Sequence, residues 1–166
     1  KMIAVDGSFK RLEQVSVPKG KAMDKMTVVS DFVNYDAVVN MPVCKSHGMT
    51  GLSICMKNWM GSTPERGSWH QDNLHQRIAD SISVFRPAWS IADATRVMLT
   101  KGPKGPSSEM NIANAIVVSK DQVAIDTYCS NAFWKGKPLP KYIELAAEMG
   151  LGVGDLSNIE VKELEA

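Results

Sequence analysis

Residues 37–51 read AVVNMPVCKSHGMTG, and this stretch decides the fold class. The run Ala37–Met41 is short, apolar and bounded by an aspartate and a proline. Such a run is typical of a strand covered on both faces, as in a parallel sheet. A polar segment with Lys45, Ser46 and His47 follows, and we expect it to form a loop at the end of that strand.

The pattern changes after this loop and predicts a helix over residues 51–60. Apolar side chains recur there at the i, i+3, i+4 and i+7 spacing of an amphipathic helix. They are Leu52, Cys55, Met56 and Trp59. Thr50 is a suitable N-cap for this helix, and Gly61 is a suitable end.

The rest of the chain alternates between strand and helix patterns. Strands are predicted over residues 2–5, 14–17, 26–30, 88–92 and 111–118, with an edge strand over 159–164. Helices are predicted over residues 71–85, 121–133 and 141–149. Strands separated by helices predict an α/β fold, a mostly parallel sheet with helices packed on it and a mixed edge strand. The 166 residues suit one domain, and the opening strand pattern indicates a fragment of a longer one.

Composition excludes several classes of function. Nineteen basic and eighteen acidic residues give a net charge of +1, and no block of like charge occurs, so we do not expect a nucleic-acid partner. No apolar run is long enough to span a membrane. The three cysteines form neither a disulfide framework nor a zinc motif. The cofactor and the oligomeric state stay open, and so does the compartment, with the cytoplasm slightly favoured.

The strongest candidate site is the polar segment that leads into the predicted helix. The first turn of a helix offers unpaired N–H groups and a partial positive charge, which Lys45 and His47 would reinforce. Such a place suits a carboxylate or a phosphate, and Gly51 would let the backbone approach it. Ser46 belongs to the same segment. The alternative is a loop that only caps a helix, with its lysines in solvent.

Four more residues are weaker candidates. Asn58 lies on the same side of the predicted helix as Thr50, whereas Lys57 points away and would have to reach around with its long side chain. His70 could fold back towards His47, and Asp93 ends a predicted strand. A metal bound by His47, His70 and Asp93 is an alternative, although we assign no metal ligand.

Asp126 falls in the middle of a predicted helix, among apolar residues. A charge there is costly unless it is paired. We therefore expect a partner such as Lys or Arg, or a functional role.

The chain resembles the bacterial and archaeal "domain of unknown function 362" family. The likeness rests on Pro42-x-x-Lys45-x-His47, Thr50-Gly51, Lys57-Asn58-x-x-Gly61, His70, Ile91-Ala92-Asp93-Ala94, Gly102-Pro103-x-Gly105 and Val123-Ala124-x-Asp126. The resemblance implies that the chain is the carboxyl-terminal half of a longer domain, with part of the site elsewhere. Some relatives resemble fusions to ferredoxin-type cysteine clusters, which implies an iron–sulfur partner domain outside this chain.

Two hypotheses about function follow. In the first, the chain is part of an enzyme, by analogy a redox enzyme, that acts on a small anionic molecule. Lys45 and His47 would be catalytic, and Ser46, Thr50, Gly51, Lys57, Asn58, His70 and Asp93 would bind the ligand. In the second, the chain is a non-catalytic domain that docks a ligand or an iron–sulfur partner. Trp59, Trp69, Met56 and Met60 would then form an exposed apolar surface.

Overall fold

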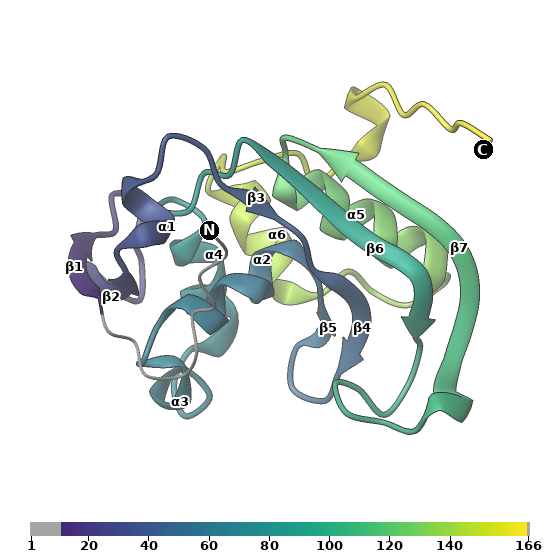
Figure 1. The fold of residues 1–166 in the computed structure, drawn as a ribbon, viewed down its shortest axis with the longest axis horizontal. Coiled ribbons are helices and arrows are strands. Elements are labelled where there is room, and N and C mark those ends of the chain that lie inside the picture. The colour runs from purple at the N-terminus through teal and green to yellow at the C-terminus, as the bar shows by residue number, and fades with distance from the viewer. Residues whose placement is uncertain (1–10, 166) are drawn as a thin grey trace.

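The computed structural model describes residues 11–165, so the strand predicted over residues 2–5 lies outside the described part (Figure 1). Its strands are β1 (Leu12–Ser16), β2 (Lys25–Val29), β3 (Val39–Asn40), β4 (Val43–His47), β5 (Gly51–Ser53), β6 (Trp89–Met98) and β7 (Met110–Ser119). Its helices are α1 (Asp31–Asn34), α2 (Cys55–Asn58), α3 (Arg66–Trp69), α4 (Leu74–Ser81), α5 (Gln122–Phe133) and α6 (Lys141–Glu148). Short 3-10 turns are η1 (Trp59–Ser62), η2 (Ser107–Glu109) and η3 (Leu156–Asn158).

The main sheet has five strands, and its centre is parallel as predicted. Strands β3 and β4 both pair in parallel with β6. The two remaining strands are antiparallel, because β5 forms a hairpin with β4 and β7 runs back along β6. A separate two-stranded antiparallel sheet joins β1 and β2. The predicted α/β fold is therefore confirmed.

The strand predicted over residues 37–41 is shorter and more exposed than expected. Only Val39 and Asn40 form β3, and the side chains of Val39 and Met41 are 47% and 68% exposed. Pro42 has no N–H to continue the ladder, and it separates β3 from β4. The prediction that this strand is covered on both faces was wrong.

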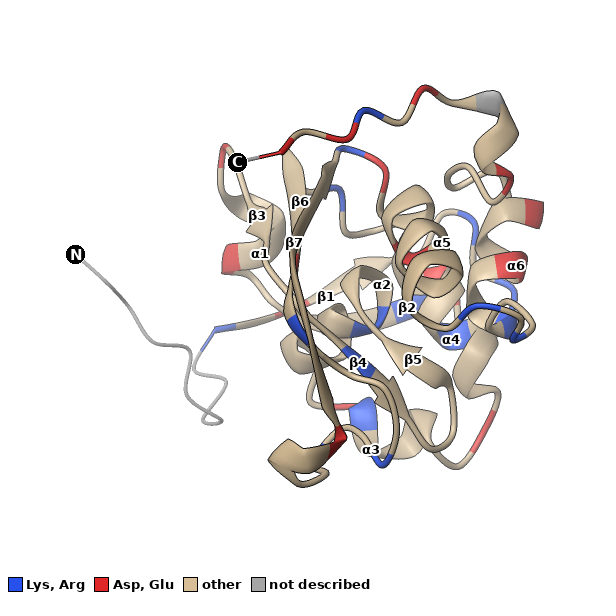
Figure 2. Ribbon diagram, turned by 90° about the vertical axis from the view of Figure 1, so that its right-hand side faces the viewer, with Lys and Arg blue, Asp and Glu red and all other residues tan. Residues whose placement is uncertain are grey.

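The two faces of the main sheet differ sharply. Cys44, Ala92 and Ala94 are fully buried on the inner face, in a cluster with Ile125 and Cys129 of α5. Helices α5 and α6 lie on one side of β6 and β7 (Figure 2). On the outer face, exposed apolar side chains gather on four strands, namely Val39, Val43, Trp89, Ile112, Ile116 and Val118.

A second hydrophobic cluster fills the space between β2, α2, α4 and α6. Its largest fully buried members include Trp69, Tyr142 and Phe85. The rings of Trp59 and Phe85 stack with their centroids 4.5 Å apart. This cluster and the one beneath the main sheet meet at α2, because Cys55 belongs to one and Met56 to the other.

The helix predicted over residues 51–60 was wrong in its first half. Gly51, at φ +76°, leads into β5, which pairs with β4 through His47 and Gly51. The Thr50 hydroxyl donates to the Leu52 carbonyl at 2.8 Å, so Thr50 closes a turn and caps no helix. The apolar stripe is buried as expected, but three short elements present it, namely β5, α2 and η1.

The edge strand predicted over residues 159–164 is also absent from the described structure. The side chain of Leu164 is 91% exposed, and these residues pair with none of the described strands. Alternating apolar residues form a strand only where a neighbouring ladder accepts their backbone groups.

Candidate functional site

Lys45 and His47 lie on the same face of β4, two residues apart. Cys44 and Ser46, which alternate with them along β4, point to the inner face and are buried, whereas Lys45 and His47 are half-buried. The period of two in a strand therefore places both cationic residue types together. They belong to a strand and not to the predicted loop, so the sheet fixes their relative position.

Lys57 joins them from α2, although its side chain is only 9% exposed. Neither Lys57 nor Lys45 forms a hydrogen bond or an ion pair with any residue between 11 and 165. Burial lowers the pKa of Lys57, and the charge of Lys45 lowers it further. A lysine that is this little exposed and has no carboxylate partner is rare in folded proteins.

Asp126 positions the helix that carries Lys57. Its carboxylate accepts hydrogen bonds from the backbone N–H groups of Cys55 and Met56, at 2.8 and 3.2 Å. The hydroxyl of Tyr142 also points to it, at 3.4 Å. Complete burial raises the pKa of Asp126 to about 7. The partners of this buried carboxylate are thus backbone N–H groups in the first turn of α2, and not the Lys or Arg that the sequence led us to expect.

The imidazole of His47 is held by the turn that follows β4. Its Nδ1 accepts hydrogen bonds from the backbone N–H groups of Met49 and Thr50, each at 3.3 Å. Burial lowers the pKa of His47 to about 4, and the nearby charges of Lys57, His70 and Lys45 act in the same direction. His47 is therefore a neutral imidazole at neutral pH.

His70 comes from the end of α3, and its ring centroid lies 6.1 Å from that of His47. Its Nδ1 lies 2.8 Å from the Arg66 carbonyl oxygen, which fixes the orientation of the ring. The expectation that His70 folds back towards His47 is met by this geometry. We refer to Lys45, His47, Lys57 and His70 as the Lys–His cluster.

The positive charge of the Lys–His cluster comes from Lys45 and Lys57. The neighbouring charges that act on Lys57 and His47 are all cationic. In Figure 2 the blue segments of β4 and α2 lie near one another. Donors without acceptors in a partly buried position can bind an oxyanion through charge-assisted hydrogen bonds.

Two predicted site residues bond elsewhere. The Ser46 hydroxyl faces the inner side and accepts the Gly102 N–H at 2.9 Å, so it anchors the Gly102–Gly105 loop to β4. Asp93 lies in the middle of β6 and not at a strand end, because β6 continues to Met98. Its carboxylate accepts the N–H and hydroxyl of Thr95, and these bonds lower its pKa.

The remaining predicted residues serve the backbone around the cluster. Thr50 and Gly51 form the hairpin turn that holds His47. Asn58 is exposed and donates through Nδ2 to Asn40 Oδ1 at 2.8 Å. Asn40 in turn donates to the Cys55 carbonyl and to Gln122, so two buried amides hold the backbone of α2 in place.

Sequence reasoning missed Asn40 and Gln122. Gln122 also accepts the indole N–H of Trp59 and donates to the Phe85 carbonyl. Both amides are buried, and a polar residue inside the apolar run of residues 37–41 was the available signal. Buried amides are normally fully hydrogen-bonded, as these are.

The metal alternative finds no support in the geometry. Residues 11–165 contain no group of three His, Cys, Asp or Glu side chains that could hold a metal ion. His47 and His70 are neighbours, but the carboxylate of Asp93 is bonded to Thr95. In the same part of the chain, no helix is sufficiently long and apolar to cross a membrane.

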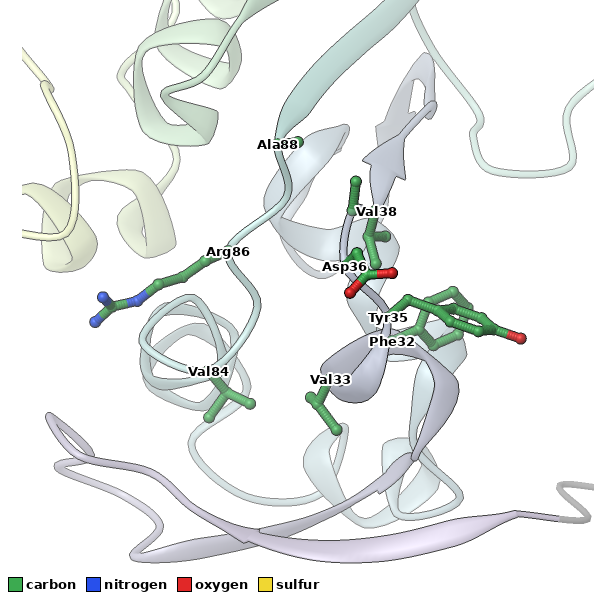
Figure 3. A pocket seen from close by; sticks show the side chains of 9 residues that line it. Phe32, Val33, Tyr35, Asp36, Val38, Val84, Arg86 and Ala88 are labelled. Carbon is green, nitrogen blue, oxygen red and sulfur yellow. The ribbon is translucent and has the colours of Figure 1, made fainter.

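The apolar docking surface proposed around two tryptophans is also absent from the described surface. Trp59, Trp69, Met56 and Met60 are between 0% and 4% exposed. A pocket of about 280 Å³ lies elsewhere, between α1 and the segment after α4, and its wall includes Phe32, Val38 and Val84 (Figure 3). No residue of the Lys–His cluster lines this pocket.

A comparison with known families gives a match over residues 2–131, to the family described as "Domain of unknown function (DUF362)". No curated protein and no solved structure matches the chain. The matched range includes the whole Lys–His cluster and Asp126. It covers the amino-terminal part of this chain, so it does not support the expectation of a carboxyl-terminal half.

Proposed function

The chain belongs to the DUF362 family, and from the Lys–His cluster inside the matched range we propose that it binds a small oxyanion, a carboxylate or a phosphate. Lys45 and Lys57 supply the charge, while His47 and His70 supply the hydrogen-bonding edges of two imidazoles. Both hypotheses from the sequence, a substrate of an enzyme and a ligand of an accessory domain, would use this site. The proposal concerns binding, which precedes any reaction.

The observation that carries the proposal is the state of Lys57. Burial removes part of the hydration of Lys57, which is only 9% exposed, and no carboxylate in the described structure replaces it. An unpaired charge in such a place is a cost in the empty protein. A bound oxyanion supplies the missing counter-charge, and this is the simplest reason for keeping Lys57 there.

The proposal gives His47 a binding role in place of the catalytic role expected from the sequence. Its depressed pKa of about 4 keeps the ring neutral, so it adds no charge to the site at neutral pH. We assign it to hydrogen bonding with the anion and leave the charge to the two lysines. Ser46 and Asp93 are left out of the site, because their side chains are bonded to Gly102 and Thr95.

Calorimetric titration tests the proposal. Inorganic phosphate, sulfate and acetate are titrated into the full chain, at concentrations up to about 10 mM, which covers weak binding. We expect at least one of them to bind, and Lys57→Met to weaken its binding at least about tenfold. The exposed Lys135 is the matched control, and Lys135→Met should leave the Kd unchanged. An unchanged Kd in Lys57→Met, or no binding of any of the three anions, would refute the proposal.

A further inference from the structure

We infer that the two imidazoles of the Lys–His cluster present opposite protonation at Nε2 and so select an oxyanion that carries its own hydroxyl, such as hydrogen phosphate. This inference rests on the proposed function, because it names the kind of anion that the site takes. It follows from the hydrogen bonds that each ring makes through Nδ1.

The tautomer of His47 is set by two backbone N–H groups. The N–H groups of Met49 and Thr50 can only donate, so the Nδ1 atom that they share at 3.3 Å must be an acceptor. A neutral imidazole with an unprotonated Nδ1 carries its hydrogen on Nε2. His47 therefore offers a donor to a ligand.

The tautomer of His70 is the reverse. The Arg66 carbonyl oxygen can only accept, so Nδ1 of His70, 2.8 Å away, must carry the hydrogen. When this ring is neutral, Nε2 has a lone pair. No hydrogen bond within the described range 11–165 occupies that atom. His70 therefore offers an acceptor.

The inference places one small anion against both rings. Their centroids lie 6.1 Å apart, and each hydrogen bond to a ring nitrogen spans about 2.9 Å. Hydrogen phosphate matches the four groups of the cluster. Its two negative charges face two lysines, an unprotonated oxygen accepts from His47, and its hydroxyl donates to His70.

Sulfate is the informative competitor, because it has the same shape and charge but no proton. In the same position it would place an oxygen lone pair against the lone pair of His70. A site built to accept a hydrogen bond rejects an analogue that lacks the donor, since its own polar group is left unpaired. The cluster should therefore prefer phosphate to sulfate.

The test compares the two anions by calorimetry at about pH 8, where phosphate is mainly the monoprotonated dianion. We expect the wild type to bind phosphate at least about tenfold more tightly than sulfate. His70→Ala should bring the two Kd values together, whereas His47→Ala should weaken both anions alike. Equal wild-type binding of both anions would overturn this inference and leave the proposed function standing. Binding of neither anion would overturn this inference, and the proposed function would fall with it only if acetate did not bind either.

A spectroscopic measurement keeps the inference falsifiable if a variant fails to fold. The ¹⁵N shifts of the imidazoles in the unliganded wild type report which nitrogen carries the hydrogen. We expect the Nε2–H form for His47 and the Nδ1–H form for His70. The same tautomer in both rings would overturn the inference.

Discussion

Replacing Lys57 by Met should stabilise the empty protein and weaken its response to an oxyanion. The methionine side chain has similar length and adapts to irregular surroundings, so it should fit where a 9% exposed lysine now lies. The substitution removes an unpaired ammonium group and its repulsion with Lys45. Removing an unsatisfied buried polar group is worth about 1–3 kcal/mol in proteins.

Because the Lys57 side chain keeps some contact with water, we expect the lower part of that range, about 1–2 kcal/mol. For a chain of this size that corresponds to a rise in Tm of roughly 2–8 °C. Phosphate at ten times its Kd should add about 1.4 kcal/mol to the free energy of unfolding of the wild type. For the variant, whose Kd should be at least about tenfold higher, the same phosphate concentration should add at most about 0.4 kcal/mol.

Thermal and urea unfolding, each with and without phosphate, measure both effects. Lys45→Met is the matched comparison, since half-buried Lys45 should change stability by less than about 0.5 kcal/mol while still weakening binding. The reasoning is refuted if Lys57→Met lowers the free energy of unfolding by more than about 1 kcal/mol. It is also refuted if phosphate stabilises that variant as much as the wild type.

Three further predictions concern the surroundings of the cluster. The pKa of Asp126 is raised to about 7, so the free energy of unfolding of the wild type, relative to Asp126→Asn, should fall as pH rises from about 4 to about 7. The fall should be at most about 4 kcal/mol. A difference between the two proteins that stays constant with pH in urea unfolding would contradict this prediction. The pKa of His47 is lowered to about 4, so the contribution of its neutral ring to the free energy of unfolding should be complete above about pH 6.5 and lost as pH falls through 4. Because the ring is only half-buried, this contribution should be about 1 kcal/mol at most. His47→Gln should show no such pH dependence. A Cβ at Gly102 would overlap the Ser46 carbonyl, so Gly102→Ala should cost about 1–3 kcal/mol in thermal unfolding, and an unchanged Tm would show that the loop gives way freely.

The fold could be predicted from the sequence wherever one pattern ran uninterrupted. Residues 111–118 and 141–149 form β7 and α6 nearly as expected. The prediction failed after Thr50, because a hairpin strand followed by a short helix produces the same apolar spacing as one longer helix. Spacing reports which side chains are buried, and the positive φ of Gly51 decides how the backbone buries them.

The same error explains what was mistaken about the site. The predicted helix began at Gly51, and along that helix Lys57 points away from the side of Thr50. The actual helix α2 begins only at Cys55, so this direction does not apply. Lys45, His47 and His70 were identified from residue type and order, and the structure brings them together. The sequence could not predict that Asp126 caps α2, because its partners are backbone N–H groups, which no side-chain pattern reveals.

The cap that Asp126 places on α2 joins residues about 70 positions apart in the chain. A helix of four residues has no stability of its own in water, so α2 can form only after α5 has docked beneath the sheet. Contacts of such long sequence separation are slow to form. Because Cys55 and Met56 of α2 belong to the two hydrophobic clusters, we expect Lys57 to reach its place only when both clusters close, late in folding.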